Sequence, residues 1–180
     1  MHISVKAQDI TTVHCAKCVL INAANTSMRG GGGVDGAIHK AAGTKLLEEL
    51  VSNAPNGVKT TECVKTGGYD LADVIVHCAG PNFSAIPNVD STQAKDLLKK
   101  TYSNAFREGL DKGITKFITP VISGAIFRGR FSEKEIVQFT MAALKELKSD
   151  MPEVEEVEFY VLPGSPYLEL LGVYTQRDEL

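Results

Sequence analysis

Residues suited to binding a polar ligand are concentrated between positions 22 and 36. Asn22 and Asn25 flank the end of an apolar run, glycines fill 30–33, and Asp35 follows. Glycine lets a backbone approach a ligand closely, and successive backbone N–H groups that lead into a helix bind anions. An asparagine amide both donates and accepts hydrogen bonds, which suits sugar hydroxyls. The stretch therefore predicts a phosphate or diphosphate site with polar side chains beside it.

Each of these features also has a purely structural interpretation. The glycines would otherwise form a flexible surface loop. Asn22 and Asn25 would shape the turn, a frequent use of asparagine. Asp35 would favour the start of a helix through the helix dipole, whereas its functional role would be to orient a water molecule or a sugar hydroxyl. For each of these side chains taken alone, the structural interpretation is favoured, and the functional one stays open.

Two familiar glycine motifs fit the segment poorly. Gly31, Gly33 and Gly36 satisfy the dinucleotide-binding pattern G-x-G-x-x-G. That motif needs a tight turn directly after a strand and an acidic residue about 20 positions later, but the polar segment 25–29 intervenes and 52–57 holds no acid. A P-loop also needs a Gly-Lys-Ser/Thr sequence, which does not follow here.

The rest of the chain reads as alternating strands and helices. Apolar runs predict strands at 2–6, 19–23, 74–79, 116–122 and 157–162, and the alternating stretch 58–64 predicts a more exposed strand. Helical spacing of apolar residues predicts helices over 34–42, 94–105 and 136–147, the last opened by a Ser132–Glu135 capping box. This order predicts a mainly parallel sheet with helices on both faces, and ligand sites where the loops 24–33 and 123–130 leave the strands.

Length and composition fit one globular domain over residues 1–180, because 43% of the residues are hydrophobic. The net charge of −3, without a basic block, argues against non-specific nucleic-acid binding. No apolar run approaches the roughly 20 residues that span a bilayer, and the first residues are too polar for a signal peptide, which predicts a cytoplasmic or nuclear protein. Cys15 and Cys18 form a C-x-x-C without the second pair that a zinc site needs, so the cysteines are expected to be reduced and structural.

The segment from Ile21 to Gly43 resembles the macrodomain family, most of all its MacroD-type class. The letters INAAN at 21–25, GGGGVDGAIH at 30–39 and AAG at 41–43 agree in register with that family's pattern. Residues 9–11, 66–71, 75–81 and 120–127 are similar to further family segments, so the resemblance covers nearly the whole chain. It implies a three-layer α/β/α sandwich with a mixed, mainly parallel six-stranded sheet and a cleft for ADP-ribose.

The resemblance also implies roles for individual residues. Asp9 would accept the adenine N6 proton and Ile10 would offer its backbone N–H, with residues 160–163 beside the adenine. The two loops would hold the diphosphate, and Asn25 and Asp35 would be the catalytic pair facing the distal ribose. The implied ligand-binding set is Asp9, Ile10, Asn22, Ala23, Gly32, Gly33, Val34, Ser123, Gly124, Ala125, Ile126, Phe127 and Leu162. No metal and no cofactor is implied.

The second loop departs from the family's usual Ser-Thr-Gly-Ile-Phe-Gly. Ala125 stands in place of a glycine, which reduces backbone freedom. Arg128 stands in place of a small residue and would reach either the diphosphate or solvent, while Arg130 is expected to be solvated. His39 would either orient Asp35 or be structural. His77 lies inside an apolar strand and is expected to be a satisfied core residue.

The leading function is a metal-independent hydrolase that releases mono-ADP-ribose from Asp or Glu side chains, with water held between Asp35, the phosphates and the distal ribose. O-acetyl-ADP-ribose is a related substrate. The second is a non-catalytic ADP-ribose reader within a larger viral or multidomain protein. The third is a nucleotide- or RNA-binding accessory domain, which the absence of a basic face disfavours. The expected partners are ADP-ribose and mono-ADP-ribosylated proteins, without a membrane, and no pattern indicates an oligomer, so a monomer is expected.

Overall fold

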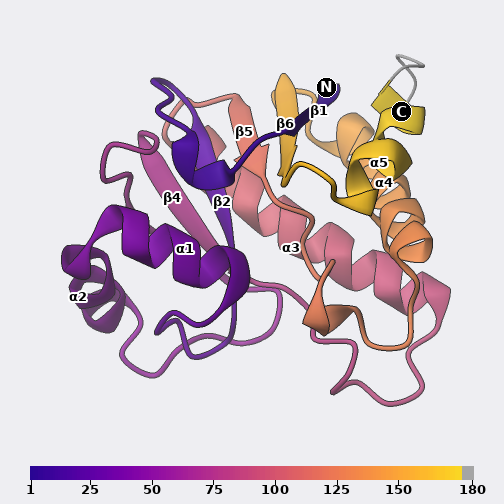
Figure 1. Cartoon of the computed structure of the whole chain (residues 1–180), viewed down its shortest axis with the longest axis horizontal. Helices are drawn as coiled ribbons and strands as arrows, with labels where there is room; N and C mark the ends of the chain where they lie inside the picture. The colour runs from indigo at the N-terminus through magenta and orange to yellow at the C-terminus, as the bar shows by residue number, and fades with distance from the viewer. Residues whose placement is uncertain (176–180) are drawn as a thin grey trace.

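The computed structural model describes residues 1–175, in which six strands form one mixed sheet (Figure 1). The strands are β1 (His2–Ala7), β2 (Val19–Ala24), β3 (Cys63–Gly67), β4 (Val74–Ala79), β5 (Lys116–Thr119) and β6 (Glu156–Val161). Their order across the sheet is β1-β6-β5-β2-β4-β3, and only the β3–β4 pair is antiparallel. The prediction of a mixed, mainly parallel six-stranded sheet is confirmed.

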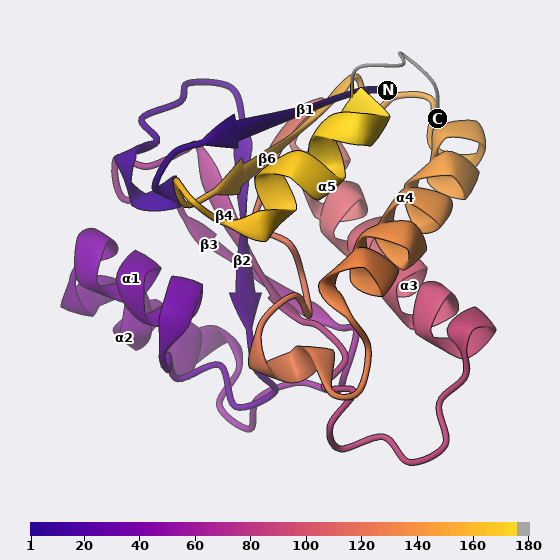
Figure 2. The same ribbon diagram turned by 45° about the vertical axis from the view of Figure 1, so that its right-hand side comes forward.

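Helices cover both faces of this sheet and make the fold a three-layer sandwich. The helices are α1 (Gly33–Ala42), α2 (Thr44–Asn53), α3 (Ser91–Asp111), α4 (Glu133–Asp150) and α5 (Pro166–Thr175), with short 3₁₀ turns η1 (Ile10–Thr12) and η2 (Ile126–Arg128). Figure 2 shows α1 and α2 on one side of the sheet and α3, α4 and α5 on the other. The predicted capping box closes the start of α4, with reciprocal bonds between Ser132 and Glu135.

The sheet separates two hydrophobic cores of unequal size. The larger core lies under α3, α4 and α5, where Phe106 meets Phe117 edge to face with ring centroids 4.8 Å apart. The smaller core lies under α1 and α2 and includes Ile38, Leu46 and Leu50. Burial on both faces explains why the central strands read as continuous apolar runs.

Some predicted elements have different bounds in the structure. The strand predicted at 58–64 is misplaced, because turns fill the residues before 63 and Thr61 has a φ of 77°. The strand predicted at 116–122 ends at Thr119, since Pro120 has no N–H to continue the ladder. Helices α2 and α5 were not predicted, although α2 buries Leu46 and Leu50 at helical spacing.

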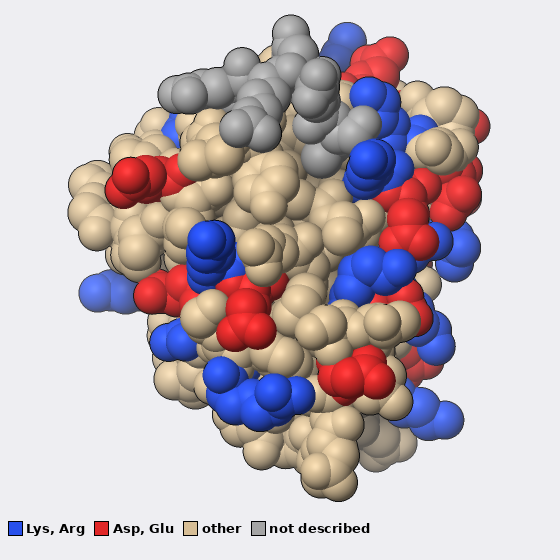
Figure 3. Space-filling model, turned by 90° about the vertical axis from the view of Figure 1, so that its right-hand side faces the viewer, with Lys and Arg blue, Asp and Glu red and all other residues tan. Residues whose placement is uncertain are grey.

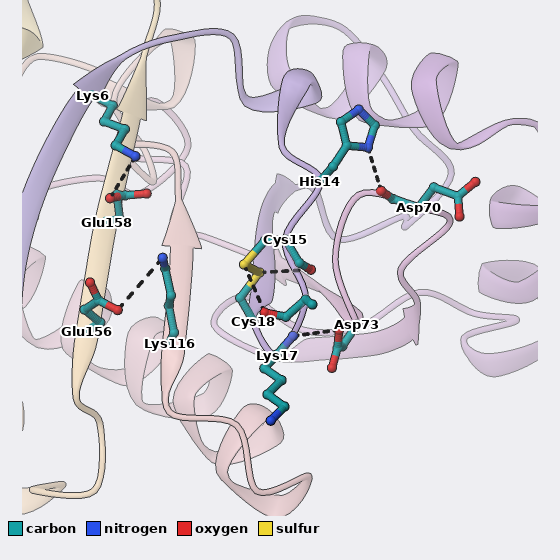
Figure 4. The surroundings of a disulfide bond; sticks show 11 residues. Lys6, His14, Cys15, Lys17, Cys18, Asp70, Asp73, Lys116, Glu156 and Glu158 are labelled. Atoms are coloured by element: carbon teal, nitrogen blue, oxygen red, sulfur yellow. Dashed lines mark hydrogen bonds and ion pairs between the residues drawn. A yellow bond between two sulfur atoms is a disulfide. The ribbon is translucent and has the colours of Figure 1, made fainter.

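The expectation that all cysteines are reduced is wrong for the C-x-x-C pair. Figure 4 shows the disulfide between Cys15 and Cys18 in the turn between η1 and β2. That turn brings their Cα atoms within 5.9 Å, inside the range that a disulfide bridges. The loop is also fastened to the segment before β4, where the Cys15 N–H donates to Leu71 and the Lys17 N–H donates to Asp73. Cys63 and Cys78 are free thiols.

Surface charges of both signs are mixed on the face that Figure 3 shows. Ion pairs join α3 to α4, with Lys95 Nζ 2.7 Å from Glu146 Oε2 and Lys99 Nζ 3.2 Å from Asp150 Oδ2. Within residues 1–175, no helix combines the length and apolarity that crossing a bilayer requires.

Candidate functional site

The candidate site lies where the chain leaves two adjacent central strands in opposite directions. The loop after β2 leads to α1 on one face, and the loop after β5 leads to α4 on the other. Such a divergence opens a crevice at the carboxyl ends of parallel strands. A cavity of about 290 Å³ occupies this place. It is lined by Ala23, Ala24, Asn25, Gly31, Gly32, Gly33, Val34, Asp35, Gly80, Pro120, Val121, Ile122, Ser123, Gly124, Ala125, Ile126 and Phe127.

The first wall of the cavity is the glycine loop and the start of α1. Gly32 is the N-cap of α1 and has no side chain to cap the helix, so the first backbone N–H groups are left for another acceptor. Gly33 has a φ of 59°, a conformation that favours glycine. The helix dipole adds partial positive charge at the same end. This wall therefore presents uncapped backbone N–H groups and the positive end of a helix dipole, an arrangement that suits an anion.

The second wall is the loop after β5. Ser123 adopts a φ of 59°, and its hydroxyl donates to the Pro81 carbonyl at 2.6 Å. The Tyr167 hydroxyl from α5 donates to the Gly124 carbonyl. These bonds fasten both sides of a backbone turn that faces the glycine loop. Ala125 has a φ of −114° and a ψ of −118°, which is neither helical nor extended, but its φ is negative and so is not the left-handed conformation that favours glycine.

Asp35 presents its two carboxylate oxygens to different surroundings. Oδ1 accepts a hydrogen bond from Asn22 Nδ2 at 2.8 Å and lies 3.4 Å from His39 Nε2. Oδ2 is buried and has no hydrogen-bond partner among the described residues. Burial raises the pKa of Asp35, while the Asn22 hydrogen bond and the His39 charge oppose that rise. One oxygen is thus anchored and the other is available to a ligand or water.

Asn25 serves both the turn and the cavity. Its Oδ1 accepts from the Ser27 N–H at 3.1 Å and from the Ser27 hydroxyl at 2.6 Å, which is the turn-shaping role. Its Nδ2 faces the space above Gly31: a Cβ atom added at Gly31 would lie 3.5 Å from both Asn25 Nδ2 and Asp35 Oδ2. A donor and an acceptor therefore converge on one point of the cavity.

Most of the predicted site residues line this cavity, and four do not. Asn22 is fully buried behind it and touches it only through Asp35. Asp9, Ile10 and Leu162 follow β1 and β6, whose carboxyl ends lie at the same edge of the sheet. Asp9 Oδ1 accepts from the Thr11 N–H and hydroxyl, Ile10 is buried, and the Leu162 side chain is 61% exposed.

The two arginines and two histidines of interest also have defined places. Arg128 donates to the Phe131 carbonyl at 2.7 Å, which is neither of the two predicted alternatives. Arg130 is exposed, as expected, and it also donates to the Val89 carbonyl and stacks over the Phe131 ring. His39 pairs with Asp35, and His77 is fully buried with both ring nitrogens hydrogen-bonded.

Several lining residues were predicted only as parts of longer segments and not as individual site residues. They are Ala24, Gly31, Gly80, Pro120, Val121 and Ile122. Gly31 lies in the segment 24–33, which was predicted as a ligand-binding loop. Pro120 was instead placed inside the strand predicted at 116–122, although a proline cannot continue a strand ladder, and that was an available signal. Gly80 has a packing reason, because a Cβ atom there would lie 2.5 Å from Ile122 Cγ2.

The cavity has no cationic side chain among its described lining residues. Across residues 1–175, no three His, Cys, Asp or Glu side chains gather where they could share a metal ion. The groups that face the cavity are backbone amides, the Asn25 amide and the Asp35 carboxylate, together with apolar side chains.

Known proteins share this sequence pattern and fold. The Macro domain family model matches residues 21–137. O-acetyl-ADP-ribose deacetylase 1 of Pantoea vagans is 34% identical over 169 residues, which is 92% of this chain and 94% of that protein. The O-acetyl-ADP-ribose deacetylase of Enterobacter cloacae is 38% identical over 122 residues, 66% of this chain and 64% of that protein.

Solved structures agree with the sequence match. The Oceanobacillus iheyensis macrodomain with ADP is 29% identical and superposes with a TM-score of 0.77, covering 96% of this chain and 91% of that one. The Trypanosoma brucei macrodomain in complex with ADP-ribose is 25% identical with a TM-score of 0.77, covering 97% of this chain and 68% of that one. The glycine loop, the sheet order and these matches agree, and the chain belongs to the Macro domain family.

Proposed function

We propose that this chain binds ADP-ribose with the diphosphate between its two loops and hydrolyses ADP-ribose derivatives. Its principal substrate would be mono-ADP-ribose attached to an aspartate or glutamate of a modified protein. The observation that carries the proposal concerns Asp35 Oδ2. This buried carboxylate oxygen has no hydrogen-bond partner among the described residues, and Asp35 lines the cavity at the start of α1. A buried acceptor of this kind calls for a bound donor such as water.

Backbone amides would recognise the diphosphate. The described lining residues include no Lys or Arg, so the negative charge must be met by the first turn of α1 and by the loop at 121–125. Asp9, Ile10 and Leu162 would contact the adenine from the neighbouring strand ends. The exposed Leu162 side chain would then be covered by the base. This arrangement lets a chain of net charge −3 bind an anionic nucleotide.

The chemistry would be displacement by water at the anomeric carbon of the distal ribose. The water oxygen would bond to that carbon, and the bond to the side-chain carboxylate would break with its electron pair leaving on the carboxylate. Asp35 Oδ2 would orient the water and accept its proton, a role helped by a pKa that burial raises. Asn25 Nδ2 would fix a ribose hydroxyl beside it, so that both reactants are held in place.

The names of the relatives support O-acetyl-ADP-ribose as a second proposed substrate. Two proteins from Pantoea vagans and one from Enterobacter cloacae bear the name O-acetyl-ADP-ribose deacetylase, at 33–38% identity. The ester differs from a modified carboxylate side chain in size, not in the kind of carbonyl that it presents. The same cavity would therefore accept the small ester, and the rates on the two substrates should be measured together.

The decisive experiment compares wild type with Asp35→Asn and Glu158→Gln. Asn at 35 keeps an oxygen for Asn22 to bond and removes the base. Glu158 is a second buried carboxylate, bonded to Ser4 and paired with Lys6 outside the cavity, so its variant controls for the loss of a buried charge. Release of ADP-ribose from a carrier protein modified on acidic side chains is followed for each variant, and ADP-ribose binding is measured by calorimetry.

We expect Asp35→Asn to lose at least about a hundredfold in release rate, the size of a general acid–base contribution, while Glu158→Gln stays near wild type. Binding of ADP-ribose without release by wild type would instead identify a reader module. Absence of ADP-ribose binding would overturn the proposal as a whole. RNA binding with a steep salt dependence would favour the accessory-domain alternative.

A further inference from the structure

A chain of four buried polar side chains runs from the edge of the sheet to Asp35. Thr66 in β3, His77 in β4, Asn22 in β2 and Asp35 in α1 are each at most 5% exposed. Thr66 Oγ1 lies 2.9 Å from His77 Nε2, and His77 Nδ1 lies 2.9 Å from Asn22 Nδ2. Asn22 Nδ2 in turn lies 2.8 Å from Asp35 Oδ1. The site is thus linked across two strands to the antiparallel edge strand.

The proton positions in this chain follow from which groups can donate. Asn22 has two amide hydrogens on Nδ2, and both neighbours of that atom, Asp35 Oδ1 and His77 Nδ1, must accept. Thr66 already donates its hydroxyl to the Gly67 carbonyl at 3.0 Å, so it accepts from the His77 ring. His77 is therefore neutral, with its proton on Nε2 and a lone pair on Nδ1.

The surroundings keep the ring in that state. Burial, and to a smaller extent the charge of nearby His39, lowers the pKa of His77 to about 3. The ring centroids of the two histidines are 6.2 Å apart. A neutral imidazole at neutral pH supplies the Nδ1 acceptor continuously. If the Asn22 amide rotated by half a turn, its oxygen would face the Asp35 carboxylate, and two acceptors would oppose each other.

We propose that His77 is a positioning residue: its Nδ1 lone pair, held in place by Thr66, fixes the Asn22 amide so that Asn22 donates to Asp35 and aims Asp35 Oδ2 into the cavity. The proposal rests on the function proposed above only in giving the aimed oxygen a catalytic task. His77 itself lies behind Asn22 and is absent from the cavity lining. It would therefore act on the reaction entirely through the carboxylate.

The consequence concerns the acidity of Asp35. The groups that face its carboxyl are His39 from its own helix, Asn22 from β2 and, behind Asn22, His77 from β4. The Asn22 hydrogen bond and the His39 charge stabilise the carboxylate against the effect of burial. If His77 no longer holds the amide, the first of these two effects weakens. The Asp35 pKa then rises, and so does the pH at which the enzyme acquires its base.

Three variants test whether His77 positions Asp35 through Asn22. His77→Leu removes both ring nitrogens, and His77→Asn keeps an oxygen where Nδ1 stands and so restores the partner for Asn22. Thr66→Val leaves the ring but removes its Nε2 partner, and it serves as the second variant if His77→Leu does not fold. Thr101→Val is the matched control, because Thr101 is an equally buried threonine in α3 whose hydroxyl bonds only to the Leu97 carbonyl among the described contacts.

Two readouts separate positioning from a loss of structure. The first is the titration of the Asp35 carboxyl carbon by ¹³C NMR in the absence of substrate, which needs no activity. The second is the pH profile of ADP-ribose release. We expect His77→Leu and Thr66→Val to raise the Asp35 pKa by about half a unit or more and to move the acidic limb of the profile by the same amount. His77→Asn and Thr101→Val should remain close to wild type.

The proposal is overturned if folded His77→Leu shows the wild-type carboxyl titration, or if long-range ¹H–¹⁵N spectra of wild type place the His77 proton on Nδ1. If the wild-type protein showed no hydrolytic activity, only the proposed function would be contradicted. The titration of the Asp35 carboxyl and the spectra of the His77 ring would still test the positioning role of His77.

Discussion

Gly36 in α1 lies directly against the backbone of Gly31, so that a Cβ atom added at Gly36 would stand 2.3 Å from the Gly31 carbonyl oxygen. No real Cβ contact is that short, and the obstacle is backbone that cannot rotate aside. The glycine loop and the helix therefore meet at a distance that only glycine permits, and the shape of the proposed anion-binding wall depends on this position.

The variant Gly36→Ala tests that dependence. We expect the methyl group to push the loop away from α1 and to weaken ADP-ribose binding at least about tenfold, or about 1.4 kcal/mol, because the amides would no longer converge. Isothermal calorimetry measures the loss. Gly172→Ala is the control, since a Cβ atom at Gly172 meets nothing within 4 Å. Unchanged affinity in Gly36→Ala would show that the loop shape does not matter for binding.

Gly31→Ala should separate catalysis from folding. The added Cβ atom would make ordinary contacts of 3.5 Å with Asn25 Nδ2 and Asp35 Oδ2, so the melting temperature should change little. The methyl group nevertheless occupies the point on which the two polar groups converge, beside the Asp35 Oδ2 that is proposed to orient the attacking water and the Asn25 Nδ2 that is proposed to fix a ribose hydroxyl. We expect ADP-ribose release to fall by about tenfold or more, because even a small displacement of reactants is costly. A wild-type rate would place the water elsewhere.

Two glycines in helices should respond to alanine with opposite signs. A Cβ atom at Gly109 in α3 would lie 2.5 Å from the Phe117 ring and 2.8 Å from Val19 Cγ2, so Gly109→Ala should destabilise the fold by about 1–3 kcal/mol through overpacking. Gly172→Ala in α5 meets open space and should stabilise it by about 0.5–1 kcal/mol through helix propensity. Urea denaturation of both variants measures the difference, and equal signs would contradict the packing described here.

Stability should depend on pH through His77. Its pKa falls from 6.5 to about 3 on folding, so between these values the unfolded chain binds a proton that the folded chain does not. The free energy of unfolding should then decrease by about 1.4 kcal/mol for each unit of acidification below 6.5. The raised pKa of Asp35 acts in the opposite sense: stability is lost as pH rises from 3.8 through the folded pKa.

The two effects can be separated in an Asp35→Asn background. There we expect the acid slope of His77 to appear undiminished in urea titrations between pH 4 and pH 7, and to flatten when His77→Gln is added. A slope that survives in the double variant would have to come from other ionisable groups.

The sequence predicted the sheet well because parallel strands that are buried on both faces consist of continuous apolar runs, which are easy to recognise. It also placed the glycine loop after a strand and before a helix, which located one wall of the cavity. The second wall was predicted mainly by resemblance, because its decisive feature is a backbone conformation. The positive φ of Ser123 has no sequence signature, and neither does its bond to Pro81.

Other features were beyond pattern reasoning for physical reasons. His77 was expected to be a satisfied core residue, and it is buried and satisfied, but its partners come from β2 and β3 and no spacing rule brings them together. Arg128 was given two destinations, yet it bonds to a carbonyl three residues away. Long side chains find local acceptors that depend on the path of the loop, and that path is known only after folding.

The unequal sizes of the two cores predict that local unfolding occurs more readily on one face of the sheet than on the other. The layer of α1 and α2 lies on the smaller core, and the N-terminal end of α1, where the diphosphate is proposed to bind, belongs to that layer. Partial opening of that layer would expose less apolar surface than opening of α3, so its amides should exchange with deuterium sooner. A ligand bound at the start of α1 would stabilise the layer of α1 and α2 against this partial opening. Hydrogen exchange would then slow in α2, although no α2 residue lines the cavity. Ligand binding would thus be detectable away from the site, through reduced local unfolding of α2.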